Sequence, residues 1–401
     1  MRGKIDSIRL QNDKNYHFAF QILENLKERI CPDIKLLNKL YGKERAQNVK
    51  FIIEKHLLEE TKKIRIIRKH NPNVKFDIYN ARKSIEKNLT FQKIHKSLLI
   101  DEIPLKNDME MIYGDYSEKI IDIFRIYIEN GLKRKCELGA ATHLNRVGAV
   151  AFQIGLNEPG SFKYSAIAAL HDAIEDLLYI AKYKDGKILG ILHYNNFIEL
   201  YIPFDLFKSV QILTNHYDLI LKYTKDRLLN EDKYFSKRNV IQVLTELNKT
   251  SPSEIKYYID LMLNCFENFN VENDFIDNAK WFCYTNLYMD GITSASQKAN
   301  DFRLFEIKGI DLSDNAQGKD SLGLESRIRN IIKNSLWGIK GYSLNSDWEP
   351  LNRHIEEILE ESLYSAENMI IKDLLENQSV MDFLESALIK YKKLETVFYT
   401  N

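Results

Sequence analysis

The residues best suited to chemistry stand together in one short segment, His171-Asp172-Ala173-Ile174-Glu175-Asp176. On a single helix His171 and Glu175 would share one stripe, and Asp172 and Asp176 would share the next. Carboxylates this close repel one another, and removal from water makes the repulsion more costly. Solvent relieves that cost on a surface, whereas a divalent cation relieves it in a cleft. An imidazole with carboxylates suits Mn²⁺, Fe²⁺ or Zn²⁺.

A second histidine favours the interpretation as a metal site and disfavours that of a solvated helix face. His143 lies 28 residues before His171. The residues that lead into the acidic segment, Ser165 to Leu170, are small or apolar, so the segment emerges from a packed core. A buried, hydrogen-bonded histidine is the alternative for the His171-Asp172 pair taken alone. The two histidines and the carboxylates together favour metal binding.

The spacing of these residues resembles that of the HD-domain phosphohydrolases, and most closely the hydrolase domain of the RelA/SpoT alarmone enzymes. That domain carries an Arg-Lys pair, a metal-binding histidine nine residues after the arginine, an HDxxED motif and a Lys-x-x-Asp segment. Here Arg134-Lys135 stands at that distance before His143. Residues 171–176 match HDxxED completely, and Lys298-Ala299-Asn300-Asp301 resembles the Lys-x-x-Asp segment. The resemblance covers roughly residues 117–310.

The resemblance implies one divalent ion, most often Mn²⁺ in this family. Such an ion lowers the pKa of a bound water and shields phosphate charge. The implied ligands are two imidazoles and two carboxylates, those of His143, His171, Asp172 and Asp301.

The resemblance also implies roles for the neighbouring charged residues. Glu175 and Asp176 would orient or deprotonate the attacking water. Substrate phosphates would be bound by three basic side chains, Arg134, Lys135 and Lys298. Arginine can bind them through its planar fork and lysine as a point charge.

The expected function is therefore that of a metal-dependent phosphohydrolase acting on a nucleotide, with pyrophosphate removal from a (p)ppGpp-like alarmone as the nearest analogy. One alternative is an HD-type dNTPase or nucleotidase, which shares the histidine and aspartate ligands without requiring the whole HDxxED motif. Another is a nucleotide sensor without catalysis. Two departures from the family pattern favour the sensor, namely Leu144 in place of proline and Phe305 where an asparagine is frequent.

Length and composition indicate a helical protein of more than one domain. The chain has 401 residues, of which 44% are hydrophobic and 28% charged, and these values exclude a disordered chain or a pure coiled coil. Glycine and proline are sparse, so helix breakers are few. We therefore expect an all-α fold, and the resemblance implies an HD-type helical bundle. Its expected organisation is a basic helical N-terminal region (1–115), the HD domain (116–315) and a helical C-terminal region (316–401).

Charge is unevenly distributed along a chain whose net charge is zero. Residues 1–100 carry 23 Lys and Arg against 11 Asp and Glu, and the rest of the chain carries the opposite imbalance. A basic block can contact nucleic acid. It can also attract the acidic remainder of the same chain, so nucleic acid is only a weak expectation. The main expected partner is a nucleotide or a small phosphorylated substrate.

The sequence also predicts a cytoplasmic location and no membrane association. The N-terminus lacks the apolar run of a signal peptide, and no stretch of 18 or more apolar residues occurs. The four cysteines are far apart and lack the spacing of zinc or redox motifs, so we expect reduced thiols.

Overall fold

The structure is a computed structural model, and it describes residues 77–134, 139–156, 159–267, 275–299, 302–317 and 337. Contacts between residues divide the chain into two units, Tyr79–Ile310 and a second unit made of Met1–Ile78 with Asp311–Asn401. The unit Tyr79–Ile310 contains most of the described residues. The helices expected before residue 77 and after residue 317 lie outside the described residues.

The described residues confirm an all-α fold. The helices up to the acidic segment are α5 (Asp77–Lys87), α6 (Leu89–Leu99), α7 (Lys106–Tyr113), η1 (Gly114–Tyr116), α8 (Ser117–Glu129), α9 (Ala140–Ile154), α10 (Ser161–Ala169) and α11 (Ala173–Ile180). Those that follow are η2 (Gly190–His193), α12 (Tyr194–Tyr201), α13 (Phe207–Leu213), α14 (His216–Asn230), α15 (Lys237–Thr250), α16 (Ser253–Glu267), α17 (Phe275–Phe282), the π-helical segment η3 (Cys283–Tyr288), α18 (Met289–Ala299) and α19 (Arg303–Gln317).

The turn-forming residues around Lys184-Asp185-Gly186 predict a short hairpin, and the structure has one there. Strands β1 (Tyr183–Lys184) and β2 (Lys187–Ile188) pair in antiparallel fashion, with Tyr183 opposite Ile188. The turn between them uses Asp185 and Gly186, both with positive φ angles of 51° and 73°. An Asp-Gly pair is favoured in such a turn because both central residues need left-handed backbone angles.

One local expectation from the sequence is wrong. The turn-forming residues from Pro104 to Asp115 predict a break, but this segment contains α7. Buried Met109, Ile112 and Tyr113 share one face of that helix and outweigh its turn-forming residues. Residues 238–268 are predicted to be helical, and the structure confirms this. They form two helices, because Pro252 cannot donate a backbone hydrogen bond and separates α15 from α16.

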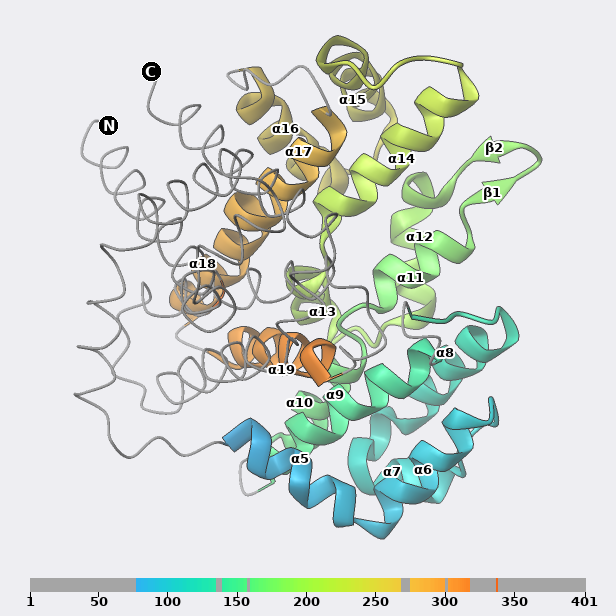
Figure 1. The fold of residues 1–401 in the computed structure, drawn as a ribbon, viewed down its shortest axis with the longest axis vertical. Helices are drawn as coiled ribbons and strands as arrows, with labels where there is room; N and C mark the ends of the chain where they lie inside the picture. Colours follow the sequence, from blue (N-terminus) through green and yellow to red (C-terminus); the bar gives the residue numbers. More distant parts are fainter. Residues whose placement is uncertain are drawn as a thin grey trace, which may run out of the picture. The chain divides into compact units, whose positions relative to one another are not determined.

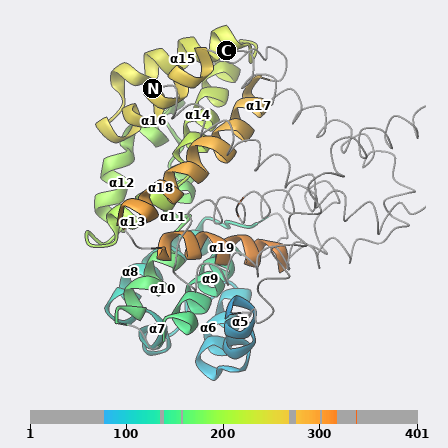
Figure 2. The same cartoon turned by 90° about the vertical axis from the view of Figure 1, so that its left-hand side faces the viewer.

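Within the unit Tyr79–Ile310, two groups of helices pack as separate layers. Figure 1 and Figure 2 show α5 to α10 in one group and α11 to α18 in the other, with α19 running between them. In the first group α9 packs closely against α10, and α7 and α8 also contact this pair. In the second group α14 packs against α15, α16 and α17. Within the described residues, no helix has both the length and the apolar character needed to span a membrane.

Helix α9 is the central helix of the first group, and its residues from Ala140 to Val147 are nearly all buried. Its close packing depends on Gly148. A Cβ atom at this position would lie 2.8 Å from the Tyr113 ring and 3.0 Å from the Cβ atom of Ala169. Tyr113 is fully buried, and its hydroxyl donates to Oδ1 of Asn145 at 2.9 Å, so the ring cannot move aside easily. The absence of a side chain at Gly148 therefore sets the distance between α9, α7 and α10.

We predict that Gly148→Ala destabilises the protein although alanine is the better helix former. Overpacking of this kind costs about 1–3 kcal/mol, more than the roughly 0.5–1 kcal/mol that alanine contributes to a helix interior. Gly291→Ala in α18 is the matched control, because its Cβ atom would meet nothing within 4 Å. Thermal unfolding followed by circular dichroism should show a lower melting temperature for Gly148→Ala and an equal or higher one for Gly291→Ala. Equal melting temperatures would contradict the packing account.

Candidate metal centre

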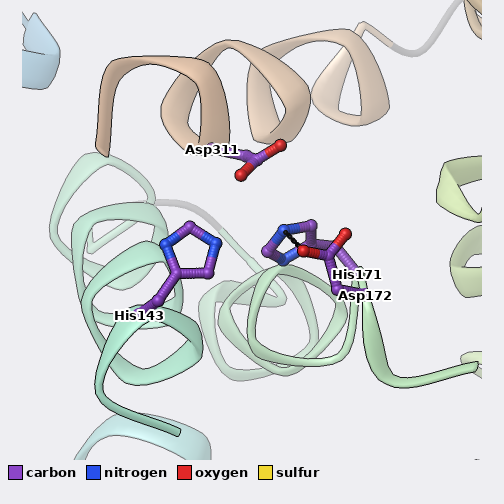
Figure 3. A group of neighbouring side chains, drawn as sticks. All are labelled: His143, His171, Asp172 and Asp311. Atoms are coloured by element: carbon purple, nitrogen blue, oxygen red, sulfur yellow. Dashed lines mark ion pairs between the residues drawn. The ribbon is translucent and has the colours of Figure 1, made fainter. Parts of the chain in front are cut away.

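Four side chains from separate parts of the sequence converge on one buried space (Figure 3). His143 projects from α9, His171 and Asp172 come from the turn between α10 and α11, and Asp311 projects from α19. Each offers one nitrogen or oxygen atom, and these atoms all lie within 4.8 Å of one another. His143, His171 and Asp311 are 1%, 0% and 2% exposed. The cluster could hold a metal ion, because its donor atoms are near enough to share one ion.

The His171-Asp172 pair lies in a turn, and the expectation of one continuous helix over residues 171–176 is wrong. Helix α10 ends at Ala169, and α11 begins at Ala173. The Ala173 N–H donates to the Leu170 carbonyl at 2.9 Å, which closes the turn. The break places Nε2 of His171 3.2 Å from Oδ2 of Asp172. Adjacent residues on one regular helix point about 100° apart, so the turn is what brings the two groups together.

The hydrogen bond at the other ring nitrogen of His171 determines which nitrogen can bind a metal. Nδ1 lies 2.7 Å from the Ala168 carbonyl oxygen. A carbonyl oxygen only accepts, so Nδ1 carries the proton and Nε2 presents its lone pair to the cluster. Such a bond to the backbone is the usual way in which a protein orients a metal-binding histidine. The His143 ring packs edge-on against that of His171, with centroids 5.3 Å apart.

Asp311 is a ligand candidate that the sequence analysis missed. It is the first residue after the boundary between the two units, but that boundary falls inside the continuous helix α19. The preceding turns of α19 are fixed to the unit Tyr79–Ile310, because the Tyr164 hydroxyl donates to Glu306 and the Lys308 ammonium lies 5.5 Å from the centre of the Tyr288 ring. These contacts set the rotation of α19 and so the direction of Asp311.

A sequence signal for Asp311 exists. The segment Lys308-Gly309-Ile310-Asp311 has the same Lys-x-x-Asp spacing as Lys298 to Asp301, and Asn315 follows four residues later. Nδ2 of Asn315 donates to Oδ1 of Asp311 at 2.6 Å. Asp301 itself lies outside the described residues, so its assignment as a ligand stays a prediction.

The predicted phosphate-binding residues have different positions. Nη1 of Arg134 lies 3.7 Å from Oδ2 of Asp172, so this guanidinium borders the cluster. Lys135 lies outside the described residues. Lys298 is exposed on α18 and does not belong to the cluster, but it lines a large cavity described below.

Glu175 and Asp176 lie in the first turn of α11, each held by a hydrogen bond from another element. The backbone N–H of Asn215 donates to Oε1 of Glu175 at 2.6 Å. The Tyr127 hydroxyl donates to Oδ2 of Asp176 at 2.9 Å. Burial and the negative charge of Asp172 raise the pKa of Glu175 to about 8 and that of Asp176 to about 6. Two more carboxylates therefore lie beside the cluster, where their negative charge is costly.

The donor set fits a divalent cation. Two imidazole nitrogens and two carboxylate oxygens suit Mn²⁺, Fe²⁺ or Zn²⁺, and the set contains no thiolate. A cation would offset the charge of the ligand carboxylates and would favour the ionised forms of Glu175 and Asp176, whose pKa values are raised without it.

Comparisons with known proteins add no relative. No family model, no curated protein and no solved structure matches this chain. The candidate metal centre therefore stands on its own geometry, and the likeness to HD-domain phosphohydrolases stays a prediction from sequence motifs.

We predict that the protein binds one Mn²⁺ or Co²⁺ ion per chain and that Asp311→Asn weakens this binding at least tenfold, because the amide replaces a charged ligand. His171→Ala should have a similar or larger effect. Isothermal titration calorimetry measures both, and Asp122→Asn on α8, where the side chain is half exposed and outside the cluster, serves as the control. The same titration of Asp301→Asn tests the carboxylate that the sequence predicted. Metal affinity unchanged in both Asp311→Asn and His171→Ala would refute the metal centre.

Proposed function

We propose that this protein is a metal-dependent phosphohydrolase that acts on a nucleotide. The observation that carries the proposal is the convergence of His143, His171, Asp172 and Asp311 within 4.8 Å. Beside these four lie a guanidinium, that of Arg134, and two further carboxylates. A cation site, an anion-binding group and proton acceptors in one place are what hydrolysis of a phosphate ester or anhydride requires.

Each part of the site has a distinct task in the proposed reaction. When bound, the metal would make a water more acidic and offset the negative charge of the phosphate. Asp176 and Glu175 are fixed by Tyr127 and Asn215, so their remaining oxygens can orient that water and take up its proton. Positioning of this kind, together with charge neutralisation, supplies most of the rate acceleration in phosphoryl transfer.

Arg134 is the side chain best placed to bind a substrate phosphate. It is partly exposed, with 27% of its side chain accessible, so solvent and substrate can reach it. Its guanidinium borders Asp172 at 3.7 Å and can bind two phosphate oxygens at once. The phosphate would then lie next to the metal site.

The resemblance to the RelA/SpoT hydrolase domain makes pyrophosphate removal from a (p)ppGpp-like alarmone the first reaction to test. The two departures that favoured a non-catalytic sensor carry less weight on the described geometry. Leu144 is 1% exposed and belongs to the buried hydrophobic core. If Asp311 is the last ligand, the position four residues on is Asn315 and not a phenylalanine.

We expect purified protein with Mn²⁺ to release phosphate or pyrophosphate from at least one member of a panel of ppGpp, dNTPs, cyclic nucleotides and NADPH. Asp172→Asn should abolish the release, with kcat reduced by a factor of about 10³ or more, because it removes a metal ligand and the partner of Arg134. The far-ultraviolet circular dichroism spectrum should be unchanged. No release from any substrate would count decisively against the proposal.

Glu175→Gln separates the proposed enzyme from an HD-type nucleotidase, which does not require the whole HDxxED motif. We expect a fall in kcat of about 10²-fold or more with metal affinity unchanged, since proton acceptors typically contribute that much. An unchanged kcat would favour the nucleotidase.

A further inference from the structure

A large open cavity lies within the unit Tyr79–Ile310, beside the candidate metal centre. Its volume is about 1050 Å³, just above the range of about 300–1,000 Å³ for small-molecule sites. Helices α10, α13, α14, α16, α18 and α19 and the segment η3 form its walls. None of the candidate metal ligands lines it.

The walls of the cavity are rich in positive charge. They carry the four basic side chains of Lys163, Lys208, Lys298 and Arg303 and a single acidic one, that of Asp290. Lys163 is paired with Asp205 at 3.3 Å. Within the described part of the chain, Lys208 and Lys298 are exposed and engage in no hydrogen bond or ion pair. Their ammonium groups are therefore available to an anionic ligand.

Another wall of the cavity is aromatic. The Tyr258 ring contacts those of Tyr217 and Tyr257 edge-on, with ring centroids 5.4 Å and 5.3 Å apart. The Tyr258 ring stacks on His216 at 4.1 Å, which fixes its position. Tyr257 is 61% exposed, so one face of an aromatic ring is open to a ligand at this wall. Exposed tyrosines beside basic groups bind bases by stacking while the cations bind the phosphates.

The cavity and the candidate metal centre lie along one face of α19. Leu304 and Ile307 line the cavity, and Asp311 follows Ile307 by one helical turn. This spacing corresponds to about 6 Å along the helix axis. Tyr288 also lines the cavity, and burial together with the charges of Glu175 and Asp172 raises the pKa of its hydroxyl. Burial is the largest cause of that rise.

We propose that this cavity binds the part of the substrate that is not cleaved, the base and remaining phosphates of a nucleotide. The base would stack on Tyr257, and phosphates would contact Lys208 and Lys298. The position of this ligand relative to the metal rests on the proposed function. The binding itself needs neither the metal nor the reaction, since the groups involved belong to the cavity.

Calorimetry on the full-length protein in EDTA tests the binding without the metal. ADP and GDP are the probes, compared with adenosine, guanosine and pyrophosphate. We expect at least one diphosphate to bind at least tenfold more tightly than its nucleoside and than pyrophosphate, because only the intact nucleotide reaches both walls. The inference would be overturned if neither diphosphate binds with a Kd below about 1 mM, which corresponds to a binding free energy of about −4 kcal/mol. Equal binding of pyrophosphate would overturn it too.

Variants assign the binding to the cavity. Lys208→Ala and Lys298→Ala should each weaken diphosphate binding about tenfold, which is ~1.4 kcal/mol. Lys187→Ala, an exposed change in the hairpin, is the matched control. Tyr257→Ala should weaken binding about tenfold, whereas Tyr257→Phe keeps the ring and should retain the affinity. The inference fails if the double variant of Lys208 and Lys298 binds as tightly as Lys187→Ala.

Asp172→Asn distinguishes this inference from the proposed function. The variant should lose metal binding and hydrolysis but keep diphosphate affinity in EDTA, since Asp172 does not line the cavity. Loss of affinity in this variant would contradict a separate binding cavity. If the Lys208 and Lys298 variants hydrolyse the substrate as fast as the wild type does, the proposed function stands. The cavity is then not the substrate site of that reaction.

Discussion

Negative charge concentrated in a buried space is the constraint on which the candidate site depends. Asp172 and Asp311 converge with two imidazoles, and Glu175 and Asp176 lie beside them. Burial alone would lower the pKa of Lys222, but the charges of Asp218, Glu175 and Asp176 outweigh burial and hold it above its ordinary value. That ammonium already pairs with Asp218 at 2.8 Å. A divalent cation at the cluster would offset the remaining charge.

The helices that position the cluster are held by contacts that leave little freedom. Gly148 lets α9 approach α7 and α10, which brings His143 toward the turn that carries His171. The bond from His171 to the Ala168 carbonyl then directs its second nitrogen inward. Helix α19 is held by the contacts of Glu306 with Tyr164 and of Lys308 with Tyr288. Asp311 on the same helix then completes the cluster. A site of this accuracy needs such support, because small displacements of ligands are costly for metal binding.

Much of this could be predicted from the sequence, and the rest depends on tertiary packing. The all-α fold was predicted from the scarcity of helix breakers, and the Asp185-Gly186 turn from its residue types. The membership of His143, His171 and Asp172 in one cluster could be predicted because their identities and spacing form a specific motif. Asp311 was missed because two Lys-x-x-Asp segments occur in the sequence and spacing alone does not choose between them. The break between α10 and α11 was missed because the apolar run before His171 reads as continuous helix.

Anomalous X-ray diffraction at the manganese edge from crystals of the Mn²⁺-loaded protein would test the central claim most directly. The account predicts one strong anomalous peak among His143, His171, Asp172 and Asp311, about 2.0–2.3 Å from each donor atom. A peak at another position, or no peak after loading with millimolar Mn²⁺, would contradict it.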